Sequence, residues 1–131
     1  MKLFTKPVAA VFAILGMIGT AHAGAKFSFG VTVDTTNRYA NGNLGDARSS
    51  ADVLQFIGCH TTARRASATY MVCEARDAWG VYGTCSSMDA NLIAAIQGIG
   101  PSSSILFKWD AAGECTDIEV RNSSHYAPVT P

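Results

Sequence analysis

Apolar and polar residues alternate with a period of two near the start of the chain, which predicts a half-buried strand. The alternation places four apolar residues on one face: Phe27, Phe29, Val31 and Val33. The residues that follow are rich in Asn, Gly and Ser and predict a loop, although Asn41-Gly42 is also a turn signal. Residues 24–50 are therefore expected to form an N-terminal arm with at most one strand.

Three further strands are predicted between residues 53 and 85. β-branched and apolar residues indicate one strand over Val53–Thr61 and a second over Ala68–Arg76, with a polar connection between them. Residues 77–80, DAWG, predict a turn because glycine adopts a positive φ without strain. Residues 81–85, VYGTC, then return as a short third strand.

A single helix is predicted after the third strand. Ser86 or Ser87 is expected to cap its N-terminus, and Pro101 lies just beyond its expected end. Apolar residues spaced as on one helix face form a stripe that must be buried: Leu92, Ile93, Ile96 and Ile99.

A hairpin is predicted at the end of the chain, over residues 102–122. Its loop, residues 111–113, fits a type I turn closed by a glycine bulge. That loop sets a register in which Leu106 faces Ile118 and Trp109 faces Cys115, so that Leu106, Ile118 and Val120 share one face. A slip of one residue would exchange the two faces of the hairpin.

These elements predict an α+β fold. The order β-β-β-α-β-β is expected to form one antiparallel β-sheet with the helix packed on a face, because only the sheet is large enough to cover the apolar stripe. The domain is expected to span residues 51–126. The proline-containing residues 127–131 are expected to form a frayed tail.

The first 23 residues have the order of a secretory signal peptide. Lys2 and Lys6 precede an apolar run from Val8 to Ile18, and Ala21-His22-Ala23 provides small residues around the cleavage point. The run is shorter than the roughly 20 residues needed to cross a bilayer. We therefore expect cleavage after Ala23, no membrane anchor, and export of a bacterial type of protein to the periplasm or the extracellular space.

The charge and size of residues 24–131 limit the class of function. Ten basic residues less Lys2 and Lys6 leave eight, against ten acidic ones, which gives a net charge near −2. A nucleic-acid binder needs a basic face to neutralise phosphates, so no nucleic-acid partner is expected. A chain of this length fits one domain that gains stability from cross-links.

All four cysteines lie after the signal peptide, and an even number in a small exported chain predicts two disulfide bonds. No C-x-x-C or H-x-x-x-H pair supports a metal site, and no cofactor is indicated. We expect Cys59–Cys73 across a hairpin and Cys85–Cys115 between the helix entry and the last hairpin. Spacing alone does not fix the pairing, and a Cys73–Cys85 bridge is the rival.

Three segments carry a resemblance to a known group of proteins. They are RYANGNLGDARSSADVLQFIGC (38–59), CEARDAWGVYGTC (73–85) and SSSILFKWDAAGECTDIEVRNSSHY (102–126). Together they resemble a family of small exported bacterial four-cysteine proteins of unknown function. The resemblance implies one exported domain with four paired cysteines, and it implies no activity.

Two groups of residues are candidates for hydrolysis. His60, with Asp52 or Asp77 as an orienting acid, has the residue types of a Ser-His-Asp site, but no G-x-S-x-G motif accompanies it. Asp117 and Glu119 share a strand face about 6–7 Å apart, near the separation of a glycosidase pair. A solvated strand face explains both groups better.

The aromatic residues favour binding over catalysis. Trp79 and Tyr82 flank a turn, and exposed aromatics anchor partners because they bury a large area at small entropic cost. Arg64 and Arg65 add a basic doublet at a hairpin tip. We therefore expect an exported non-enzymatic domain, binding or structural, whose partner is a protein or surface polymer. Self-association through the N-terminal arm, a secreted inhibitor or immunity-like protein, and a small hydrolase are the alternatives.

Overall fold

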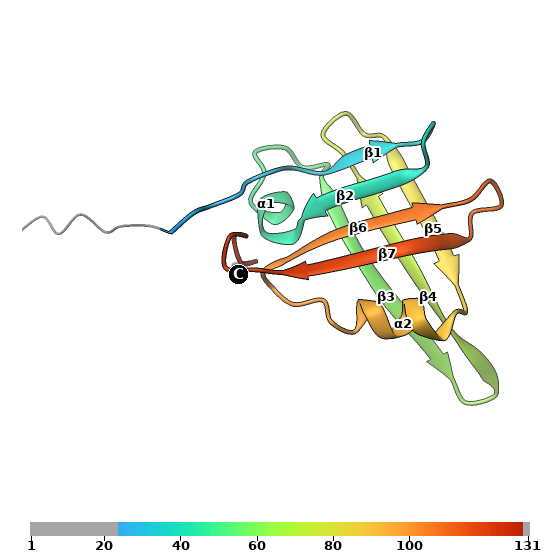
Figure 1. Cartoon of the computed structure of the whole chain (residues 1–131). Helices are drawn as coiled ribbons and strands as arrows, with labels where there is room; N and C mark the ends of the chain where they lie inside the picture. The colour runs from blue at the N-terminus through green and yellow to red at the C-terminus, as the bar shows by residue number, and fades with distance from the viewer. Residues whose placement is uncertain (1–23, 130–131) are drawn as a thin grey trace, which may run out of the picture.

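The computed structural model describes residues 24–129, which form two antiparallel sheets and two short helices (Figure 1). The predicted signal peptide, residues 1–23, lies outside the described residues. Sheet A has the strand order β1 (Thr32–Asp34), β2 (Tyr39–Asn43), β6 (Ser103–Trp109), β7 (Cys115–Asn122). Sheet B has the order β3 (Phe56–Arg64), β4 (Ser67–Arg76), β5 (Tyr82–Ser87). The helices are α1 (Leu44–Arg48) and α2 (Ala90–Ile96).

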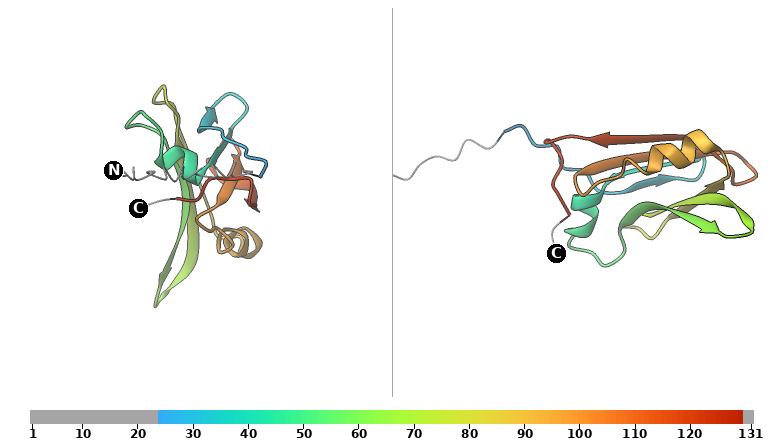
Figure 2. Two further views of the ribbon diagram at one scale, coloured as in Figure 1. Left: turned by 90° about the vertical axis from the view of Figure 1, so that its left-hand side faces the viewer. Right: turned by 90° about the horizontal axis from the view of Figure 1, so that it is seen from below.

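The two sheets lie face to face as separate layers, and their inner faces make the core (Figure 2). Ile105 and Phe107 of sheet A and Met71 of sheet B are fully buried there. The α+β class with antiparallel strands is confirmed, but the prediction of a single sheet is wrong. Each sheet has one apolar face, and here each covers that of the other, so one helix need not cover a whole sheet.

The prediction of a loose N-terminal arm is also wrong, because β2 is an inner strand of sheet A. It pairs with β1 on one side and β6 on the other, and its Ala40 is fully buried. Asn41-Gly42 therefore lies within a strand instead of a turn. The backbone at Gly42 is closely covered, since a Cβ atom there would lie 3.0 Å from Val31 Cγ2 and 3.2 Å from Cγ2 of Ile57 in the facing sheet. Single-sequence patterning missed β2 because a short buried strand of small residues has little apolar periodicity.

The residues before β1 are hydrogen-bonded to their own chain. The backbone N–H of Phe27 donates to the His125 carbonyl oxygen at 2.9 Å, and that of Phe29 donates to Asp46 Oδ2 at 2.9 Å. The chain end is also attached, because the Val129 N–H donates to the Pro101 carbonyl oxygen at 2.8 Å. Val129, within the expected frayed tail, is therefore attached to the fold, and residues 130–131 lie outside the described part.

Helix α2 begins later than the sequence predicts. Its N-cap is Asp89, whose carboxylate accepts hydrogen bonds from the N–H groups of Asn91 and Leu92, whereas Ser87 belongs to β5. Figure 2 shows α2 in the layer of sheet A, facing sheet B. The predicted stripe packs against the core, with Ile96 buried.

The β6–β7 hairpin has the predicted loop but a different register. Trp109 faces Cys115 as expected, but a bulge follows, so that Phe107 faces Ile118 and Leu106 faces Glu119. The bulge adds one residue on β7, so the residues of β7 beyond it lie on the opposite face from the one predicted. Phe107 thus shares the inner face with Ile118, in place of the predicted Leu106.

Within residues 24–129, no helix has both the length and the apolar character needed to span a membrane.

Candidate functional site

One end of the outer face of sheet B carries a guanidinium group between two aromatic rings. Phe56, Arg76 and Tyr82 lie opposite one another on β3, β4 and β5. The Arg76 guanidinium carbon lies 5.7 Å from the Phe56 ring centroid and 5.6 Å from that of Tyr82, so cation–π attraction holds it in place. Among residues 24–129 the one ion pair joins Arg121 to Glu119, which leaves the charge of Arg76 without an acidic partner.

The Tyr82 ring is oriented by its hydroxyl group. The hydroxyl donates a 2.6 Å hydrogen bond to Glu74 Oε1. This hydrogen bond, with a smaller contribution from burial, raises the pKa of Tyr82 above its usual value. The hydroxyl therefore stays protonated at neutral pH and keeps the ring fixed beside Arg76.

The β4–β5 turn next to this row is built around a buried carboxylate. Asp77 is 4% exposed, and its Oδ1 accepts hydrogen bonds from the N–H groups of Trp79 and Val81, both at 2.9 Å. Gly80 adopts a φ of 85°, a conformation that favours glycine. The turn is thus well ordered, and it holds a Trp79 side chain that is 85% exposed.

Exposed apolar side chains concentrate at this end of the molecule. Nine large hydrophobic residues are exposed within the described part of the chain, and six of them lie in residues 53–56 and 79–82. Phe56 and Tyr82 show that these two segments are neighbours, because their ring centroids are 6.3 Å apart. We call this surface the apolar end of sheet B: Val53, Leu54, Phe56, Trp79, Val81 and Tyr82.

A second turn in the same chain shows that Trp79 is not required by the turn. Residues 110–113, DAAG, repeat the hydrogen bonds of residues 77–80, DAWG: Asp110 Oδ1 accepts from the N–H groups of Ala112 and Glu114, and the φ of Gly113 is 84°. Ala112 occupies the position of Trp79. Because alanine suffices for this turn geometry, the turn itself does not require the indole group of Trp79.

The predicted contact residues do not form one site. Trp79 and Tyr82 lie together at the apolar end of sheet B. Arg64 and Arg65 lie at the opposite end, at the β3–β4 hairpin, where residues 63–68 are all exposed and project beyond the rest of the fold (Figure 1). A single partner contact centred on Trp79 therefore does not include the basic doublet.

The first hydrolase candidate lies beside a shallow hollow on the outer face of sheet B. His60 is exposed there, and Gly58 and Glu74 line the same hollow. No atom lies within 4 Å of the position that a Cβ on Gly58 would take. Asp77, one predicted partner of His60, is instead held in the β4–β5 turn. The hollow contains no Ser or Thr side chain, and its Cys59 is in a disulfide bond. Hydrolysis by His60 therefore stays a prediction, and the residues that line this hollow supply no nucleophile for it.

The carboxylate pair lies on the other sheet, away from His60. Asp117 and Glu119 share the outer face of β7, as predicted, opposite Lys108 and Leu106. Glu119 accepts a 2.5 Å hydrogen bond from Arg121 Nε. No cluster of three or more His, Cys, Asp or Glu side chains among residues 24–129 has the geometry of a metal site.

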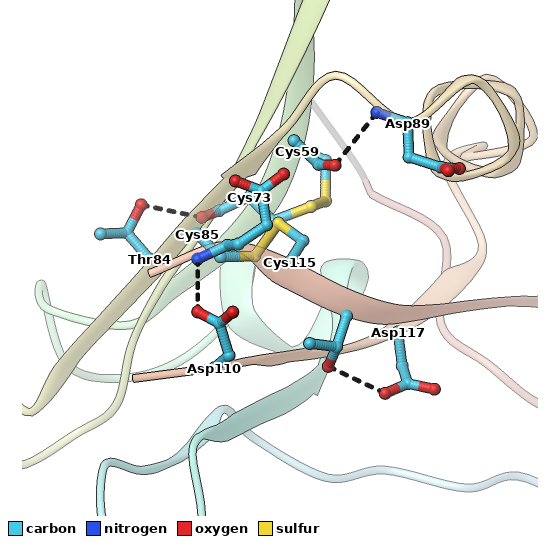
Figure 3. The surroundings of a disulfide bond; sticks show 11 residues. Cys59, Cys73, Thr84, Cys85, Asp89, Asp110, Cys115 and Asp117 are labelled. Carbon is cyan, nitrogen blue, oxygen red and sulfur yellow. Dashed lines mark hydrogen bonds between the residues drawn. A yellow bond between two sulfur atoms is a disulfide. The ribbon is translucent and has the colours of Figure 1, made fainter. Parts of the chain in front are cut away.

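The predicted disulfide pairing is confirmed. Cys59 and Cys73 are bridged across β3 and β4, with their Cα atoms 4.0 Å apart. Cys85 of β5 is bridged to Cys115 of β7, which joins sheet B to sheet A. Figure 3 shows the two bridges next to each other between the sheets.

Comparison with known proteins does not assign the site. The chain matches no family model, no curated protein and no solved structure. The resemblance to exported four-cysteine proteins stays a prediction, and the site is interpreted from its own geometry.

Sequence reasoning missed Phe56 and Arg76, yet a signal for them was present. The Cys59–Cys73 bridge places these cysteines opposite each other, so the residues three positions outward, 56 and 76, must also be opposite. Applying the same step from Cys73 and Cys85 predicts Tyr82 beside Arg76. The predicted Cys59–Cys73 bridge thus contained the register of Phe56 and Arg76, whereas that of Tyr82 depends on the pairing of β4 with β5.

Proposed function

We propose that residues 24–131 form an exported protein-binding domain, without catalytic activity, that meets its partner through the apolar end of sheet B. The observation that carries this proposal is Trp79. Its side chain is 85% exposed on a turn held by the buried Asp77 carboxylate, while the same turn elsewhere in the chain has alanine. An ordered, exposed indole is costly for solubility and useful for recognition.

The composition of the surface favours a protein partner over a surface polymer. Trp, Tyr and Arg are the residue types that most often dominate the binding energy of protein interfaces, and Trp79, Tyr82 and Arg76 occur together here. Burying an aromatic side chain gives on the order of 4–6 kcal/mol before the cost of association. The partner is expected to present an apolar patch with a carboxylate that pairs with Arg76.

Export is supported by the two disulfide bonds, because cytosolic thiols are usually kept reduced. A secreted inhibitor or immunity-like protein is the special case in which the partner is an enzyme. Self-association through the N-terminal segment has less support, since Phe27 and Phe29 donate hydrogen bonds to their own chain.

Capture of the partner from the exported fraction of the source cells tests the proposal. Immobilised residues 24–131 are compared with Trp79→Ala and with Met88→Ala, which removes an exposed side chain outside the apolar end of sheet B. We expect the wild type and Met88→Ala to retain the same protein. With the purified partner, Trp79→Ala is expected to raise the Kd about 30-fold or more.

Thermal unfolding of the same variants provides the control. Because Ala112 occupies the equivalent turn position, Trp79→Ala is expected to change the free energy of unfolding by less than about 0.5 kcal/mol. Equal capture by Trp79→Ala and wild type would contradict the proposal. Retention of a polysaccharide instead of a protein would contradict the choice of partner.

A further inference from the structure

Three of the four cysteines lie in one row across sheet B. Cys73 of the central strand faces Cys59 of β3 on one side and Cys85 of β5 on the other. Opposite residues in an antiparallel sheet have Cα atoms about 4.5–5.5 Å apart, which is within the range that a disulfide spans. Cys73 is therefore placed to form a bridge with either neighbour.

The second bridge lies next to this row. Cys85 is bonded to Cys115 of the facing sheet, and Figure 3 shows the four sulfur atoms close together. Access from solvent differs among them. Cys59 is half-buried on an edge strand, whereas Cys73, Cys85 and Cys115 are 0%, 2% and 3% exposed.

We propose that the cysteine row is a thiol–disulfide exchange site, whose substrate is a low-molecular-weight thiol that enters at Cys59. The thiolate of the small thiol attacks Cys59 Sγ, forms a mixed disulfide there, and releases the Cys73 thiolate. That thiolate attacks Cys85 Sγ, forms a Cys73–Cys85 bond, and releases Cys115, which takes up the proton that the small thiol lost. One thiol is consumed and one is produced, so no oxidant is required.

The exchange opens the bond between the two sheets from a cysteine at the surface. Cys85–Cys115 is too buried for direct attack by a solvent thiol, since attack requires access to the sulfur atom. Because Cys73 lies between Cys59 and Cys85, the thiolate released at Cys73 attacks Cys85 without a solvent thiol entering the core. A bridge inside sheet B then replaces the bridge between the sheets.

Two single substitutions that remove the same bridge test the relay. Cys59→Ser leaves Cys73 as the unpaired thiol beside Cys85, whereas Cys73→Ser leaves Cys59, which does not face Cys85. After equilibration and then unfolding in excess N-ethylmaleimide, peptide mapping should find Cys115 labelled about five-fold or more in Cys59→Ser relative to Cys73→Ser. Labelling of Cys73 alone in Cys59→Ser would overturn the proposal.

The wild-type protein gives a second measurement that does not depend on either variant folding. It is treated with a limiting amount of glutathione and trapped at early times. We expect glutathione on Cys59 with a free Cys73 at the earliest time, followed by a species with glutathione on Cys59, a Cys73–Cys85 bond and a free Cys115. First attachment of glutathione to Cys85 or Cys115, or persistence of an intact Cys85–Cys115 bond beside a free Cys73, would contradict the relay.

Discussion

At the scale of single residues, the two tryptophans have opposite roles. Trp109 packs across the interface between the sheets, where its ring atom Cη2 lies 2.8 Å from the position that a Cβ on Gly83 would take. Trp79 extends into solvent from a turn that does not need it. The first belongs to the fold, and the second is available to a partner.

The contact of Trp109 with Gly83 leads to a stability prediction. Gly83→Ala should lower the free energy of unfolding by about 1–3 kcal/mol, because the new methyl group meets both Trp109 and Val33 in a packed core. Gly58→Ala is the matched control on the same sheet, since nothing lies within 4 Å of its Cβ position. Denaturant unfolding of both variants measures the difference, and equal stability would contradict the close approach of the sheets.

At the scale of elements, the segment before β3 is ordered by one carboxylate. Asp52 Oδ1 accepts hydrogen bonds from the N–H groups of Leu54 and Gln55, both at 2.8 Å, and Oδ2 accepts from Gln55 Nε2 at 2.5 Å. Gln55 Oε1 in turn accepts from the Val31 N–H at 2.7 Å. Asp52 thus links the residues that lead into Phe56 to the N-terminal segment.

This arrangement predicts a pH dependence. The hydrogen bonds from the Gln55 side chain, then from the Gln55 and Leu54 N–H groups, lower the pKa of Asp52 to about 2 from the usual 3.8. Since the pKa is lowered on folding, the stabilisation is present above about pH 4 and is lost as the pH falls through 2. An NMR titration of the Asp52 carboxyl carbon should give a midpoint near 2.

The amides of Leu54 and Gln55 should shift with the same midpoint, and Asp52→Asn should remove that transition. A midpoint near the ordinary aspartate value would show that Asp52 does not hold the segment. The apolar end of sheet B would then include a mobile loop at Val53 and Leu54.

Elements with a strong local sequence pattern were predicted, and elements with a weak local pattern were missed. Strand β4, the apolar stripe of α2 and the glycine-containing loops were predictable, whereas β3 runs over Phe56–Arg64, three residues later than the predicted Val53–Thr61. β2 was missed because Ala40 and Gly42 are small, and their burial depends on Val31, Ile57 and the facing sheet. The bulge after Trp109 was missed because the loop alone does not fix the register beyond one residue.

At the scale of the whole molecule, the pairing of the cysteines was predicted correctly, but the division of the strands into two sheets was not. Sequence spacing suggested Cys85–Cys115 as a link between helix entry and hairpin, and the structure shows that this bond joins the two sheets. Whether strands form one sheet or two depends on long-range packing, which local periodicity does not encode. For the candidate site, the exposed Trp79 and Tyr82 were predictable, but their distance from Arg64 and Arg65 was not.

Photo-crosslinking at position 81, which leaves Trp79 in place, tests the central claim most directly. A benzophenone-bearing amino acid replaces Val81 in one variant and Met88 in another, and both are irradiated in the exported fraction of the source cells. The proposed binding domain predicts one protein adduct from position 81, in the apolar end of sheet B, and none from position 88, where the side chain is also exposed. Equal adducts from both positions, or none from position 81, would contradict it.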